Sequence, residues 1–295
     1  MNVAVFGTGA MACLFGAGLA PVARVTLVGN WPAGLAALNA HGIVVEAEGG
    51  ARATAVRAVA LGEAAPPADL ALVLVKAWQT AAVGAALGRY LAPGGLALTL
   101  QNGLGNVEQL GPRAVLGVTT AGATLLGPGR VRPGGAGVTH VAAPLWVADL
   151  LNAAGFESQA VPSAEVDSLL WGKLAVNCGI NALTALLRVP NGELLRRPDA
   201  VAVLNAAADE CAAVAAAKGI ALPYADAAAA ARAVAERTGT NRSSMFQDIL
   251  RGASTEIEAI NGAVVRAGAA AGVPTPVNMV LWRLVRAAVA ASRAC

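Results

Sequence analysis

Three polar side chains recur at four-residue intervals in an otherwise apolar run. The stretch WGKLAVNCGINAL, residues 171–183, carries Lys173, Asn177 and Asn181. Four residues are about one helical turn, so the three side chains share one face of a helix. A lysine among apolar neighbours either extends its ammonium to water or is placed to use it. An ammonium can stabilise an oxyanion and then donate a proton, and neutral amides can hydrogen-bond the oxygens of a small acid.

Lysine is rare in this chain of 295 residues. The chain has 21 lysines and arginines together, and lysine stands at positions 76, 173 and 218 alone. Arginine provides surface charge but does not release its proton near neutral pH. This bias favours a functional use of Lys76 and Lys173, with sequence drift as the alternative explanation.

A glycine-rich turn lies near the N-terminus. Residues 2–6, NVAVF, predict a strand, and the following GTGAMA leads into an apolar helical pattern through Leu19. In GxGxxA, the first glycine allows a tight turn and the second lets the backbone approach a pyrophosphate closely. The N-terminus of the following helix then favours the phosphates. The pattern predicts a dinucleotide-binding turn comprising Gly7, Gly9, Ala10, Met11 and Ala12.

The end of the next predicted strand, RVTLVGN at 24–30, would contact the ribose of such a dinucleotide. An acid there prefers NAD and a base prefers NADP. The strand ends instead on the uncharged Asn30. This feature therefore leaves both NADPH and NADH open.

Polar residues also follow two further predicted strands. Lys76 comes directly after the buried strand 69–75, and Gln101 and Asn102 end the strand 94–103. Open α/β sheets bind their ligands at the carboxyl ends of the strands, so these residues point to one ligand site. The alternatives are a solvated lysine and a plain Asn-Gly turn.

The order of these elements predicts the fold class and two domains. Strands alternating with helices, and a further strand over 113–126, predict an α/β fold with a Rossmann-type doubly wound parallel sheet. Residues 129–144 resemble a hairpin at its edge, and from Ser163 the pattern is mostly helical. We therefore expect a dinucleotide-binding domain over 1–162 and a mostly α-helical substrate or catalytic domain over 163–295.

One amphipathic pattern stands out in the second half of the chain. SSMFQDILRGASTEIEAING places Ser244, Asp248 and Glu256 at whole-turn spacings, as on one face of a continuous helix. The alternative is a solvated helix face with Ser243 or Ser244 as its N-cap.

Composition excludes several classes of partner. A net charge of +3 without a basic run argues against nucleic acid, and no window reads as a signal peptide or a membrane span. The four cysteines and two histidines show no metal-ligand spacing, which predicts no metal site and a reduced, cytoplasmic setting. The alanine-rich C-terminal helices either pair across a homodimer or pack internally.

Longer motifs carry a specific resemblance. GTGAMA, VKAWQT, LQNGLGN, GVTTAGATLLGPGRVRPGGAGVTHV, WGKLAVNCGINALTALLRVPNGEL and SSMFQDILRGASTEIEAINGAVV cover nearly the whole chain in order. With them the chain resembles the ketopantoate reductase (2-dehydropantoate 2-reductase) family. The resemblance implies NADPH-dependent reduction of 2-dehydropantoate to pantoate in pantothenate and coenzyme A biosynthesis. It also implies a Rossmann domain followed by a helical domain, with the active site in the cleft between them.

The resemblance also implies a role for each matching residue. Lys173 would protonate the carbonyl oxygen, and Glu256 would bind the substrate and support catalysis. Burial should lower the pKa of Lys173, and a carboxylate in contact would oppose that shift. The implied substrate-binding residues are Asn102, Asn177, Asn181 and Ser244, and the implied cofactor-side residues beyond the glycine turn are Asn30, Lys76, Gln79 and Asn102.

The chain departs from the family pattern at two positions. Asn30 stands where many members carry an arginine for the 2′-phosphate of NADPH, a role that Arg52 or another residue would then have to fill, and Ala121 replaces the histidine of TTHGA. The alternatives are a reductase of another 2-keto acid and a non-catalytic NADP(H)-sensing protein. The sensor needs neither Lys173 nor Glu256, so their presence argues against it.

Overall fold

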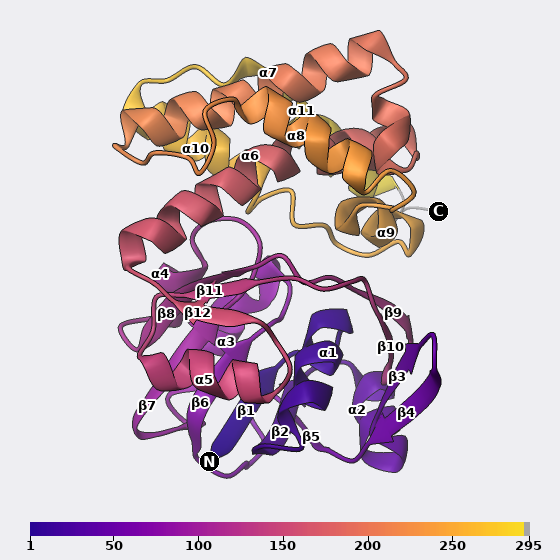
Figure 1. The fold of residues 1–295 in the computed structure, drawn as a ribbon, viewed down its shortest axis with the longest axis vertical. Helices are drawn as coiled ribbons and strands as arrows, with labels where there is room; N and C mark the ends of the chain where they lie inside the picture. The colour runs from indigo at the N-terminus through magenta and orange to yellow at the C-terminus, as the bar shows by residue number, and fades with distance from the viewer. Residues whose placement is uncertain (292–295) are drawn as a thin grey trace. The chain divides into compact units, whose positions relative to one another are not determined.

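The computed structural model describes residues 1–291 and divides into two compact units. The first unit comprises residues 1–101 and 106–166, and the second comprises Asn102–Gly105 together with the chain from Asp167 onward. Figure 1 shows the sheet of the first unit and the helices of the second. The short Asn102–Gly105 segment therefore groups with a part of the chain that lies far from it in sequence.

An eight-stranded sheet forms the centre of the first unit, in the order β12-β11-β8-β7-β6-β1-β2-β5. Neighbours from β8 through β5 pair in parallel, and β11 pairs with β8 antiparallel. The predicted α/β class is confirmed. The strands are β1 (Asn2–Phe6), β2 (Arg24–Gly29), β5 (Arg57–Ala60), β6 (Ala68–Val73), β7 (Leu91–Thr99), β8 (Ala114–Thr119), β11 (Thr139–Val141) and β12 (Ser158–Ala160).

Both faces of this sheet are buried. Along β1, Val3 and Val5 belong to one apolar core and Ala4 and Phe6 to another, because successive side chains of a strand point to opposite faces. Near-continuous apolar strands suit a parallel sheet covered by helices on both sides. The helices of this unit are α1 (Ala10–Leu19), α2 (Pro32–His41), α3 (Thr80–Leu87), α4 (Asn106–Leu110) and α5 (Leu145–Ala153), with a 3₁₀ turn η1 (Ala77–Gln79) before α3.

A second sheet of four strands has the order β4 (Gly50–Thr54), β3 (Ile43–Ala47), β10 (Arg130–Pro133) and β9 (Ala123–Gly127). The prediction of one strand over 113–126 was therefore wrong, since the chain leaves β8 at Thr119 and enters β9 in the other sheet. The Thr119 hydroxyl accepts the Ala121 N–H at 3.2 Å, a local bond that replaces a ladder bond at the break. The predicted hairpin is divided in the same way, because β10 pairs with β9 whereas β11 pairs with β8.

Helices make up the second unit. They are α6 (Ser163–Leu187), which starts within the first unit, α7 (Pro198–Ala217), α8 (Ala227–Arg237), α9 (Ser244–Leu250), α10 (Asn261–Ala271) and α11 (Pro276–Ala291), with a 3₁₀ turn η2 (Asn191–Leu194). Their common core is built around Trp171, Leu174 and Leu204. Gly179 lets α6 approach α7, since a Cβ there would lie 2.9 Å from the Leu204 carbonyl oxygen.

The continuous helix predicted across residues 244–256 was also wrong. Helix α9 ends at Leu250, and Gly252 follows in the left-handed region at φ +63°. The Ala253 N–H then bonds back to the Asp248 carbonyl at 2.9 Å, which closes the helix end. Glu256 consequently lies in the turns between α9 and α10 and not on the helix of Ser244.

Two helices are long and apolar enough to cross a bilayer by length and composition, which sequence inspection did not anticipate. They are α6 and α7, and 78% and 39% of their apolar windows are buried inside the protein. The core helix of a globular protein passes the same test. Since α6 carries Trp171 and Leu174 of the helical core, its apolar character is explained by packing.

Candidate functional site

The glycine turn before α1 is open and lets the backbone take a path that other residues rarely adopt. Gly7 has φ +126°, and a Cβ there would lie 3.2 Å from the Cβ of the buried Ala12. Gly9 caps α1 without a side chain, and a Cβ at Gly9 would meet no atom within 4 Å. The first turn of α1 carries no acidic residue. Its N–H groups and open backbone therefore fit a pyrophosphate.

The end of β2 offers an exposed, uncharged side chain. Gly29 packs against Thr8, because a Cβ at Gly29 would lie 2.9 Å from Thr8 Cγ2. Asn30 follows and is exposed. Arg52 is exposed on β4, in the other sheet of this unit. No acid or base therefore stands at positions 29–31, next to the place where a Rossmann fold contacts the ribose.

The turn after β6 holds Lys76 in place. The Lys76 N–H donates to Gln79 Oε1 at 3.3 Å, and the Gln79 N–H donates to the Lys76 carbonyl at 2.8 Å. Both side chains are half-buried. The backbone of this turn is therefore fixed from both ends, and Lys76 stands at the carboxyl end of its strand.

In the helical unit, Lys173 on α6 interacts with a buried carboxylate. Burial lowers the pKa of Lys173 from 10.5 to about 8, and the negative charge of Glu256 opposes this shift. Glu256 is 6% exposed and accepts a hydrogen bond from Asn102 Nδ2 at 3.2 Å. The structure thus combines an ammonium of lowered pKa with a carboxylate that accepts a hydrogen bond from an amide. The lowered pKa of Lys173 agrees with the sequence expectation.

Further along α6, Asn177 is half-buried and Asn181 is 6% exposed, each one turn beyond the previous polar residue. This succession forms a polar stripe, Lys173–Asn177–Asn181, on a helix whose intervening residues Leu174, Ala175 and Cys178 belong to the apolar core. The amides can donate and accept hydrogen bonds without adding charge near the ammonium.

The N-cap of α9 is Ser243. Its hydroxyl accepts the Phe246 N–H at 3.1 Å and also accepts the Thr184 hydroxyl at 2.7 Å. Ser244, the predicted site residue, is the exposed first residue of the helix. Sequence reasoning missed the hydrogen bond between Thr184 and Ser243. The adjacent Ser243 and Ser244 do not show from the sequence which of their two hydroxyls is buried.

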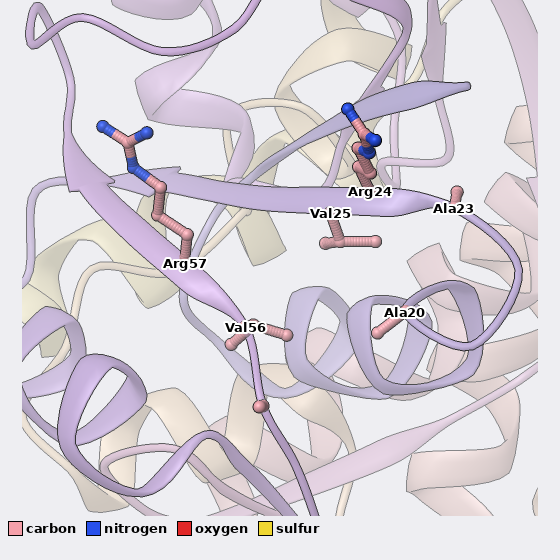
Figure 2. Close-up of a pocket in the computed structure, with 7 residues that line it drawn as sticks. Ala20, Ala23, Arg24, Val25, Val56 and Arg57 are labelled. Carbon is pink, nitrogen blue, oxygen red and sulfur yellow. The ribbon is translucent and has the colours of Figure 1, made fainter.

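An open pocket elsewhere in the first unit contains none of the predicted site residues. It lies where β2 and β5 begin, which is the amino edge of the parallel strands and not their carboxyl edge. In Figure 2 the side chains of Ala20, Val25 and Val56 face this space, and those of Arg24 and Arg57 extend away from it. Since ligands of open α/β sheets bind at the carboxyl edge, we do not assign the chemistry to this pocket.

Comparison with known proteins identifies two family models in this chain. Residues 3–145 match the model "Ketopantoate reductase PanE/ApbA", and residues 165–289 match its C-terminal counterpart. The 2-dehydropantoate 2-reductase of Halobacterium salinarum is 37% identical over 98% of this chain and 99% of its own length.

Solved structures show the same family and include a similar protein that is named for another substrate. The PanE/ApbA family ketopantoate reductase of Ralstonia eutropha JMP134 superimposes with a TM-score of 0.91 at 34% identity, over 99% of this chain and 100% of its own. A D-mandelate dehydrogenase with NADH and anilino(oxo)acetate superimposes with the same TM-score at 27% identity, over 99% of this chain and 100% of its own.

Proposed function

Because this chain belongs to the ketopantoate reductase family of NAD(P)H-dependent keto-acid reductases, we propose that it reduces 2-dehydropantoate to pantoate with NADPH. Pantothenate and coenzyme A biosynthesis in the cytoplasm is the corresponding setting. Cys13, Cys178 and Cys211 are buried and form no disulfide, which supports a reducing compartment.

One observation carries the chemical part of the proposal, namely that Lys173 lies in the field of the buried, hydrogen-bonded Glu256 carboxylate while burial lowers the pKa of Lys173 to about 8. A nicotinamide cofactor, when bound, would supply hydride to the carbonyl carbon of the substrate. The resulting alkoxide needs a positive charge and then a proton, and the Lys173 Nζ provides both. A lysine with a lowered pKa donates its proton more readily at neutral pH than a solvated lysine does.

Glu256 limits this lowering and orients the substrate. Its negative charge keeps the neighbouring ammonium from losing its proton too easily. The hydrogen bond from Asn102 leaves further lone pairs of the carboxylate for a substrate hydroxyl. Asn177, Asn181 and Ser244 are proposed to bind the remaining substrate oxygens, since amides and hydroxyls recognise them without changing the charge balance.

The first unit holds the cofactor in this proposal. The backbone of Gly7, Gly9 and Ala10 would bind the pyrophosphate, with Met11 and Ala12 in the same turn. Lys76 and Gln79 of this unit are proposed to contact the nicotinamide side, and the same role is proposed for Asn102, which groups with the second unit. NADPH is proposed from the family, and NADH is the alternative because Asn30 carries no charge and the similar D-mandelate dehydrogenase binds NADH.

A second substrate class follows from the same similarity. D-mandelate dehydrogenase acts on a 2-hydroxy acid with an aromatic side chain and shares the fold at a TM-score of 0.91. The alternative substrate is therefore the aromatic 2-keto acid that corresponds to mandelate. Reduction of 2-dehydropantoate and reduction of the aromatic keto acid would use the same proton donor. The two substrates differ in the side chain next to the keto group, which the site must accommodate.

The proposal is tested by following the absorbance at 340 nm as NADPH or NADH is consumed. The substrates are 2-dehydropantoate, the mandelate-type keto acid and branched 2-keto acids. We expect the highest kcat/KM with 2-dehydropantoate and NADPH. Lys173→Met should lower kcat about 10²–10⁴-fold, the usual contribution of general acid catalysis. Lys218→Met, at the C-cap of α7, is the matched control and should keep full activity. Dinucleotide binding without oxidation by any keto acid would instead identify a sensor.

A further inference from the structure

The Asn102–Gly105 segment is bound to a second segment that is distant in sequence. Asn102 Nδ2 donates to Glu256 Oε2 at 3.2 Å, and the Leu104 N–H donates to the Ala259 carbonyl at 3.0 Å. Gly103 has φ +81°, and a Cβ there would lie 2.2 Å from the same carbonyl oxygen. The segment thus needs a defined backbone path to bring Asn102 to Glu256.

The two residues that flank this segment are bound to one buried hydroxyl. Gln101 Nε2 donates to Thr80 Oγ1 at 2.8 Å, and Thr80 Oγ1 donates to Asn106 Oδ1 at 3.0 Å. Thr80 is fully buried, and Gln101 and Asn106 are 7% and 4% exposed. One hydroxyl therefore closes the base of the segment, with one bond to the residue before it and one to the residue after it.

The rest of the network fixes Gln101 itself. Gln101 Nε2 also donates to the Val75 carbonyl at 2.8 Å, and Gln101 Oε1 accepts the Thr99 hydroxyl at 2.9 Å. Both amide N–H groups and the amide oxygen of Gln101 are thereby used. Because unpaired polar groups are costly in a buried site, the bonds hold each other in one arrangement.

We propose that Thr80 is a positioning residue, whose hydroxyl fixes both ends of the Asn102–Gly105 segment so that Asn102 meets the Glu256 carboxylate. The Thr80 hydroxyl bonds Gln101 and Asn106, and its effect on the Glu256 carboxylate passes through Asn102. The catalytic consequence of this inference rests on the proposed reductase function, whereas its structural part does not.

Thr80→Val keeps the shape of the side chain and removes the hydroxyl, and Thr80→Ser keeps the hydroxyl. We expect Thr80→Val to lower kcat/KM about 10-fold, because Asn102 then loses its hydrogen bond to the charged Glu256 carboxylate. Thr80→Ser should keep kcat/KM within about 2-fold of the unaltered protein. Thr139→Val is the matched control, because Thr139 is equally buried in the same unit and donates its hydroxyl to Thr119 at 2.9 Å.

A double-mutant cycle separates positioning from general destabilisation. If Thr80 acts through Asn102, Thr80→Val should have no further effect on kcat/KM in an Asn102→Ala background. Effects that add in the double variant, or equal behaviour of Thr80→Val and Thr139→Val, would overturn the proposal.

Amide hydrogen exchange tests the structural part of the inference, the positioning of the Asn102–Gly105 segment, without any measurement of enzyme activity. Thr80→Val should speed exchange of the Leu104 amide, and Thr139→Val should not. An unchanged Leu104 amide would disprove the positioning role even in a protein that reduces no keto acid, so this failure and a failure of the proposed function are distinguishable. If Thr80→Val does not fold, Asn106→Ala removes the other end of the bond and must show the same exchange and the same cycle.

Discussion

The two units offer different kinds of group to the ligands proposed for them. In the first unit the predicted contacts come mainly from backbone, as at Gly7 and Gly9 before α1. In the second they come from the side chains of Lys173, Asn177 and Glu256, one of which has a shifted pKa. A backbone site is independent of pH near neutrality, whereas a site of paired charges is not. Substitutions in the first unit should therefore change affinity, and those in the second should change pH dependence.

Gly9→Ala makes the strongest test of the backbone site. A Cβ at Gly9 meets no protein atom and the backbone there is unstrained, so the variant should fold normally. The added methyl group would occupy the space proposed for the pyrophosphate. The Kd for the dinucleotide should therefore rise about 10²-fold, as for a ligand displaced from its position. Fluorescence titration measures this. Gly88→Ala, also in open space, is the control, and equal Kd values would contradict the assignment.

Glu256→Gln tests the charged site. Removing the carboxylate should raise the KM for the keto acid about 10–100-fold, as for a lost charge-assisted hydrogen bond. It also removes the charge that raises the pKa of Lys173, so that pKa should fall below about 8. Activity needs the protonated lysine and is lost as pH rises through this pKa, so the basic limb of the kcat/KM profile should move to lower pH. Glu258→Gln, an exposed acid paired with Arg266, should leave the profile and the KM unchanged.

Asn30→Arg tests whether the first unit discriminates cofactors at the end of β2. A guanidinium there would attract the 2′-phosphate, and the ratio of kcat/KM for NADPH to that for NADH should rise about 5-fold, as for one partly exposed ion pair. The companion variant Arg52→Ala should leave this ratio unchanged. A fall with Arg52→Ala would show that Arg52 already binds the phosphate.

The smallest effect concerns two adjacent serines. Ser243→Ala removes the N-cap of α9 and should lower the free energy of unfolding by about 1 kcal/mol. Ser244→Ala changes an exposed side chain and should alter stability by less than about 0.5 kcal/mol while raising the KM for the keto acid. Thermal unfolding and kinetics of both variants check this, and the reverse pattern would exchange the two roles.

The accuracy of sequence reasoning differed between elements for physical reasons. The strand, glycine turn and helix over residues 2–19 follow from local periodicity and were confirmed. The strand predicted over 113–126 failed because membership in a sheet depends on distant partners, and β8 and β9 belong to different sheets. The helix predicted through Glu256 failed at Gly252, whose left-handed conformation ended it.

By itself, the sequence determined the fold class, the family and the presence of a glycine turn and of the polar stripe Lys173–Asn177–Asn181. These depend on periodicity, glycine positions and motif order, which act over a few residues at a time. Only the tertiary structure decided that Asn102 bonds Glu256 across 154 positions and that one Thr80 hydroxyl bonds the residues on both sides of the Asn102–Gly105 segment. Burial and the distance between charges exist only once the chain has packed, and no local pattern encodes them.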